Sequence, residues 1–88
     1  MKKIDIENYH TNGLVDYTVR IGIRVFGTAF QRKESMCVFI VETNDSIMEY
    51  LSINDLPTKL VANNWQSMLG ILRKTYSEHA DCLFNLLN

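Results

Sequence analysis

Residues Leu14–Phe26 read LVDYTVRIGIRVF, a stretch in which apolar and polar side chains alternate almost without interruption. The apolar side chains occupy the odd positions, which are Val15, Tyr17, Val19, Ile21, Ile23 and Val25. Because successive side chains of a β-strand point to opposite faces of the sheet, this pattern predicts a strand with one apolar and one polar face. The stretch indicates an architecture and carries no signature of a chemical reaction.

The totals fit a single small domain, which we place over residues 1–88. Hydrophobic residues make up 47% and charged residues 22% of the chain, so its composition is that of a globular protein and too apolar for disorder. The formal net charge of −1 does not direct the protein to nucleic acid or to an anionic membrane. Cys37 and Cys82 are too few for a disulfide framework, and we expect free thiols in a cytoplasmic protein without a membrane span.

Two further strands are predicted on either side of this stretch. Ile4 and Ile6 alternate with charged neighbours and predict a strand over residues 2–9, which Asn12-Gly13 would connect by a turn to a long second strand over 14–30. A strand of that length needs a bend or a bulge, for which Gly22 and Gly27 are the candidates. After a polar turn, SMCVFIVET predicts a third strand over 35–43. The three strands would form an antiparallel meander.

The length of the second turn determines which side chains share a face. A four-residue turn would pair Phe26 with Phe39 and would place Met36, Val38 and Ile40 on the apolar face of the second strand; a loop one residue longer or shorter would invert this assignment. In this register three aromatic side chains lie on the opposite face, namely Phe26, Phe30 and Phe39. We expect the protein's own helix to cover them, because small domains usually bury their aromatic residues. A second molecule is the alternative cover.

The second half of the chain predicts helices. Asp45 is a suitable N-cap for a short helix over 46–53. Asp55 or Thr58 would cap the next helix, and from 58 to 87 apolar residues recur at helical spacing: Val61, Trp65, Met68, Leu72, Tyr76, Leu83 and Leu87. The pattern weakens near Ser77-Glu78 and leaves one long helix and a helix pair as alternatives. The predicted fold is α+β, a three-stranded antiparallel meander with the helices packed on one sheet face.

Catalytic and metal-binding patterns are weak. His79 and Cys82 are three residues apart on a predicted helix, but His10 and Cys37 would have to complete a zinc site, and zinc sites usually contain closely spaced ligand pairs. The chain has no phosphate loop, nucleophile elbow or metalloprotease motif. We therefore expect a protein that is not an enzyme and has no metal or cofactor.

The charges are more informative because they separate along the chain. Residues 18–33 contain no acid but four bases, Arg20, Arg24, Arg32 and Lys33. Residues 35–58 contain no base but four acids. The first hypothesis is a small protein-binding domain that occupies or neutralises a macromolecular partner with a basic surface, as inhibitors, immunity proteins and antitoxins do. Its expected contact residues lie in and around the short helix: Glu42, Asp45, Glu49, Tyr50 and Asp55.

Two alternatives remain open. The basic residues of the hairpin predict a nucleic-acid-binding protein, in which Phe26 and Phe30 would supply stacking partners for bases. The aromatic face of Phe26, Phe30 and Phe39, or an edge strand, would instead join a homodimer that serves as a scaffold.

Overall fold

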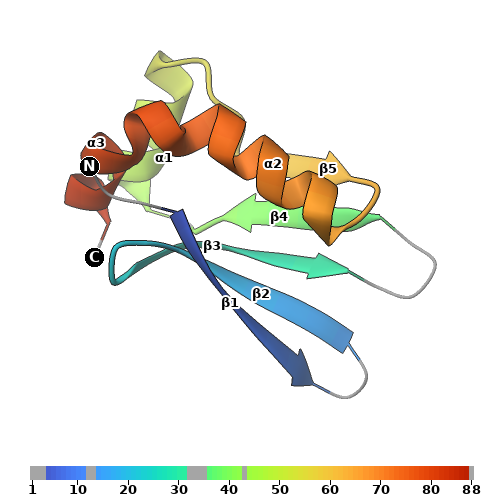
Figure 1. The fold of residues 1–88 in the computed structure, drawn as a ribbon. Coiled ribbons are helices and arrows are strands. Elements are labelled where there is room, and N and C mark those ends of the chain that lie inside the picture. Colours follow the sequence, from blue (N-terminus) through green and yellow to red (C-terminus); the bar gives the residue numbers. More distant parts are fainter. Residues whose placement is uncertain (1–3, 12–13, 32–35, 43, 88) are drawn as a thin grey trace.

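The computed structural model describes residues 4–11, 14–31, 36–42 and 44–87. It confirms an α+β fold with an antiparallel sheet, and Figure 1 shows the helices packed together on one side of that sheet. The sheet has five strands rather than three, and they lie in sequence order: β1 (Ile4–Thr11), β2 (Leu14–Ile21), β3 (Arg24–Gln31), β4 (Cys37–Val41) and β5 (Lys59–Ala62). The helices are α1 (Asp45–Ile53), α2 (Trp65–Tyr76), the short 3-10 helix η1 (Ser77–His79) and α3 (Ala80–Leu86).

The expected long strand over 14–30 is two strands, β2 and β3, joined by a tight turn. Ile21 pairs with Arg24, so Gly22 and Ile23 form a two-residue connection. Gly22 has a φ of 62°, and a positive φ at the first central position is what a type II′ hairpin turn requires of glycine. Val19 and Ile21 are buried as the alternation predicts, but Ile23 is 84% exposed because it lies in the turn.

A bulge in β3 explains why its aromatic residue reaches the core. Val19 pairs with Gly27 and Arg20 pairs with Val25, so Phe26 has no partner across the ladder. The extra residue brings Phe26 and Gly27 to the same buried side of the sheet. A Cβ atom on Gly27 would lie 2.5 Å from the Ile40 carbonyl oxygen, so only glycine permits this approach of β3 to β4.

The register between β3 and β4 inverts the predicted faces. Ala29 pairs with Phe39 and Phe30 pairs with Val38, which leaves five residues, 32–36, in the connection instead of four. Side chains of β4 therefore alternate the other way: Cys37, Phe39 and Val41 are buried, whereas Val38 and Ile40 face away from the helices. Met36, which follows the same alternation, is also exposed.

The interface predicted from Phe26 and Phe39 is consequently wrong. Both side chains are completely buried, and the protein's own helix α2 covers them. The ring centroid of Tyr76 lies 4.9 Å from that of Phe26 and 6.1 Å from that of Phe39. Only Phe30, half-buried on the opposite face of the sheet, remains from the proposed aromatic surface.

The boundaries of the helices also differ from expectation. Asn44, rather than Asp45, is the N-cap of α1. The residues expected to begin a helix at 58 form β5 instead, and α2 begins after Asn64, whose side chain accepts a hydrogen bond from the Ser67 amide at 2.9 Å. The alternative of a helix pair is confirmed, because η1 separates α2 from α3.

Candidate functional site

The exposed side of α1 and the end of α3 form a site that Asn44 holds together. Its side-chain oxygen accepts hydrogen bonds from the amides of Ser46 (2.9 Å) and Ile47 (3.3 Å), and its side-chain nitrogen donates to the Leu86 carbonyl at 3.1 Å. The first turn of α1 and the last turn of α3 are thereby fixed to each other by one residue.

Arg24 secures the same end of α3 from the sheet. Its Nη1 donates to the carbonyl oxygens of Phe84 at 2.6 Å and Leu87 at 3.1 Å, and its guanidinium lies 4.2 Å from the centre of the Phe84 ring. A cation at a helix C-terminus satisfies carbonyl groups that have no partner within the helix. Arg24 therefore caps the C-terminal end of α3.

The C-terminal end of α1 is capped by a Schellman motif. The Asp55 amide donates to the Ser52 carbonyl at 3.2 Å, and the Leu56 amide donates to the Leu51 carbonyl at 2.8 Å. Asp55 has a φ of 54°, the left-handed region that glycine or asparagine usually occupies at this position. Asp55 thus carries an exposed carboxylate immediately beyond the helix.

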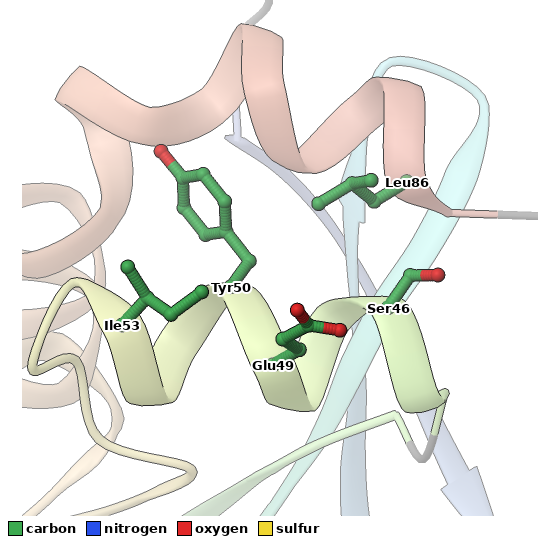
Figure 2. Close-up of a pocket in the computed structure, with 5 residues that line it drawn as sticks. All are labelled: Ser46, Glu49, Tyr50, Ile53 and Leu86. Atoms are coloured by element: carbon green, nitrogen blue, oxygen red, sulfur yellow. The ribbon is translucent and has the colours of Figure 1, made fainter.

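An open cavity of about 270 Å³ lies between α1 and α3, and we call it the α1–α3 cavity. Figure 2 shows Tyr50 extending from α1 towards the C-terminal helices and Leu86 reaching towards it from α3. The lining residues are Ser46, Glu49, Tyr50, Ile53 and Leu86. The four from α1 follow the spacing i, i+3, i+4 and i+7, so they form one row along the helix surface.

Tyr50 is fixed as a wall of this cavity. Its hydroxyl and the His79 Nδ1 are 2.7 Å apart, and the two rings meet edge to face with centroids 5.7 Å apart. Partial burial raises the pKa of the Tyr50 phenol above its usual value, and a hydrogen bond with Cys82 raises it further. The phenol is therefore neutral at physiological pH, and its contact with His79 joins α1 to η1.

No metal site emerges from that pair. Among the residues described, no group of three or more histidine, cysteine, aspartate and glutamate side chains is placed to hold a metal ion. Cys37, which would have been a zinc ligand, is buried in β4, whereas Cys82 is exposed.

The predicted acidic contact residues all lie in or beside α1. Glu49 and Tyr50 line the α1–α3 cavity, and Asp45 is the exposed first residue of the helix. Glu42 and Asp55 are exposed before and after it. The segment from 35 to 58 has no lysine, arginine or histidine, so α1 and its flanks present charge of one sign only.

The predicted basic residues do not form a comparable group. Arg24 is engaged at the end of α3, Arg20 is half-buried on β2, and Arg32 and Lys33 lie outside the described residues. Phe26, which would have stacked on a base, is in the core. The described geometry thus removes Arg24 and Phe26 from the nucleic-acid-binding hypothesis.

Sequence reasoning missed three residues that line the cavity, Ser46, Ile53 and Leu86, and it missed His79, which holds the Tyr50 hydroxyl. Ile53, which is 74% exposed, lies three residues after Tyr50 and four after Glu49, so helical spacing alone groups it with them. Leu86 reaches the site because α3 packs beside α1, and His79 reaches it from η1. No local pattern in the sequence encodes that packing.

No protein-family model, curated protein sequence or solved structure matches this chain. Within the described part of the chain, no helix combines the length and the apolar character that a bilayer crossing requires.

Proposed function

We propose that this chain is a small, non-enzymatic protein-binding domain that occupies or neutralises a partner with a basic surface through the exposed side of α1. The observation that supports this most is the combination at the α1–α3 cavity. An exposed Ile53 lies beside Glu49 on a helix whose own sequence segment, residues 35–58, carries acids and no base, while Arg24 at the end of α3 is held by the Phe84 and Leu87 carbonyl oxygens. Protein docking surfaces combine an apolar centre with a polar rim, and a rim with charge of one sign favours a partner of the opposite charge.

Asp55 supports the same proposal because its position is unfavourable for stability. A non-glycine residue in the left-handed region costs about 1–2 kcal/mol for most side chains, although aspartate tolerates it better than most. A negative charge at a helix C-terminus is also repelled by the helix dipole. A residue that violates local preferences in two ways is expected where function, rather than folding, selects it.

The acids would act chiefly on recognition and on the rate of encounter. Exposed charge pairs contribute only about 0–1 kcal/mol each, but a surface of one sign accelerates association with a partner of opposite sign. This is the electrostatic behaviour expected of an inhibitor or immunity protein that must find its target quickly.

Affinity purification from the native host tests the proposal. The variant Glu49→Gln/Asp55→Asn removes two negative charges, and asparagine is well tolerated at the positive φ of Asp55. The control Gln66→Lys/Gly70→Lys changes the net charge by the same amount on exposed positions of α2. We expect a basic protein to be recovered with the wild type and the control and to be depleted about tenfold with the acidic-site variant. Equal recovery with both variants contradicts the proposal.

A homodimer is the second candidate, and the outer face of the sheet favours it. Met36, Ile40 and Val61 are each about half exposed, on the side of the sheet opposite to the described helices. A dimer joined through this face would bury all three. Light scattering of the wild type and of Ile40→Asp decides the point, because a monomeric wild type removes this candidate.

A further inference from the structure

We propose that the α1–α3 cavity is an anchor pocket that receives an apolar side chain from a cationic amphipathic helix of the partner. This inference rests on the proposed function and specifies the kind of partner. It concerns how α1 is recognised, whereas the proposed function requires only that the acidic side of α1 is the contact surface.

The openness of the cavity favours a side chain over a small-molecule ligand. Sites for small molecules and cofactors usually measure about 300–1,000 Å³ and enclose most of the ligand. The α1–α3 cavity, at about 270 Å³, is near the lower end of that range, and it is open to solvent and so would not enclose most of a ligand. Binding energy at protein interfaces concentrates where one or a few side chains fill such a pocket.

The walls of the cavity define the chemistry of the anchor. Ile53 and Leu86 are aliphatic, and the Tyr50 ring is held in place by His79 (Figure 2). The other two lining residues, Ser46 and Glu49, are polar, so the apolar part of the wall is formed by Tyr50, Ile53 and Leu86, and the Tyr50 hydroxyl already has a hydrogen-bonding partner in His79. An aliphatic or aromatic side chain is the matching occupant.

The charges around the cavity define what surrounds the anchor. Glu49 lines the opening, and Asp45 and Asp55 are exposed towards the two ends of α1. Lysine or arginine residues beside the anchor would meet these acids without competition from a cation in residues 35–58. Charge complementarity therefore selects a cationic partner.

The shape of the wall selects a helix. Ser46, Glu49, Tyr50 and Ile53 form one row, and at 1.5 Å per residue it extends about 10 Å, close to two helical turns. A partner helix can match such a row with apolar residues three or four apart and cations beside them.

The two components predict separate kinetic effects. Loss of the apolar wall in Ile53→Ala should accelerate dissociation, because the anchor loses its contact. Loss of charge in Glu49→Gln should mainly slow association and weaken its dependence on salt. Ile40→Ala is the matched control, since Ile40 is an exposed isoleucine on the outer face of the sheet.

The test uses the full chain and three labelled helical peptides of about 20 residues, longer than the roughly 12–15 residues below which isolated helices are marginal in water. One peptide carries leucine at i, i+3, i+4 and i+7 with flanking lysines; the second replaces leucine by alanine and the third replaces lysine by glutamate. Fluorescence anisotropy and stopped-flow mixing measure affinity and rates. We expect the first peptide to bind about tenfold or more tightly than the other two. We also expect Ile53→Ala to accelerate its dissociation about tenfold, and Ile40→Ala to leave its dissociation unchanged.

Several outcomes overturn the inference. These are no binding of the leucine–lysine peptide, equal binding of the alanine peptide, or a larger effect of Ile40→Ala than of Ile53→Ala. A dimer that dissociates in Ile53→Ala would make a second copy the occupant and would also overturn it. The basic host protein separates the two proposals. If Glu49→Gln/Asp55→Asn still weakens its binding, but it dissociates from Ile53→Ala at the same rate as from the wild type, the anchor pocket is contradicted and the proposed function stands. If that protein depends on neither acid, the proposed function itself fails.

Discussion

Replacing Gly27 by alanine should destabilise the fold, because the added Cβ has no room. It would lie 2.5 Å from the Ile40 carbonyl oxygen and 2.6 Å from two ring carbons of Phe39. Ordinary contact begins near 3.4 Å, so β3 and β4 would have to separate locally by roughly 0.9 Å. The Phe39 ring is completely buried and packs against Phe26 and Tyr76, so it cannot move aside without disturbing the core.

The cost can be estimated from these contacts. Overpacking typically costs about 1–3 kcal/mol, and weakened hydrogen bonds between the strands add about 0.5–1.5 kcal/mol. Alanine has less conformational entropy than glycine in the unfolded chain, which offsets about 0.4–1 kcal/mol of this destabilisation. The net loss in the free energy of unfolding is therefore about 2 kcal/mol, which corresponds to a fall in Tm of roughly 8–16 °C for a domain of this size.

Urea unfolding followed by circular dichroism measures the loss, and Gly70→Ala is the matched control. Gly70 is exposed on α2, and an added Cβ there has no atom within 4 Å. The same substitution should therefore raise stability by about 0.5–1 kcal/mol through helix propensity. A Gly27→Ala protein as stable as the wild type would refute the bulge and the close approach of β3 to β4.

Three further substitutions test single contacts. Arg24→Gln should lower the free energy of unfolding by about 2 kcal/mol, because α3 loses a charge-assisted cap and the contact with Phe84. Amide hydrogen exchange should accelerate most in α3. Unchanged exchange there would contradict this role of Arg24. Asp55→Gly should raise the unfolding free energy by about 1 kcal/mol in urea titrations by relieving the positive φ and the charge at the end of α1, and a loss would count against that interpretation. Burial raises the pKa of Tyr76, whose hydroxyl donates to the Pro57 carbonyl, so this contribution to stability is present below about pH 10 and declines as the pH rises above it. Tyr76→Phe should cost about 1 kcal/mol at neutral pH and flatten the alkaline decline in urea titrations at several pH values; an equally steep decline would exclude Tyr76 as its source.

The sheet was only partly predictable from the sequence. The alternation of Val19 and Ile21 correctly predicts a buried face, but it continues through Ile23, and that continuity conceals the turn. A type II′ turn needs only a glycine at its first central position, and an apolar second residue leaves the alternation intact. The inverted register of β4 has a similar origin, because a single residue in a loop changes the face of every side chain that follows.

The prediction of the boundary between β5 and α2 was wrong for a different reason. Leu60 and Val61 satisfy the helical spacing that Trp65 and Met68 continue, and a short apolar run fits a strand as well as a helix turn. Asn63-Asn64 is the cap signal that separates them, and Asn64 does cap α2. Tertiary pairing with β4 then determines the conformation of the four residues of β5.

The candidate site combines a part that is visible in the sequence with a part that is not. The acids around Glu49 and the absence of bases from 35 to 58 can be read directly. The cavity requires Leu86 to lie beside α1, and the fixed ring of Tyr50 requires His79, which is 29 residues away along the chain. Such contacts depend on how α3 folds back, which residue periodicity does not determine.

Whether the partner meets α1 or the outer face of the sheet is tested most directly by photo-cross-linking in host cells. A benzophenone amino acid is placed at Ile53 in one variant and at Ile40 in another, since both side chains are exposed and lie on different faces of the molecule. We predict a cross-linked basic protein from Ile53, absent from Ile40 and lost when Glu49→Gln/Asp55→Asn is added. Cross-linking from Ile40 alone, or an adduct at Ile53 that persists without the two acids, would contradict recognition through the acidic side of α1.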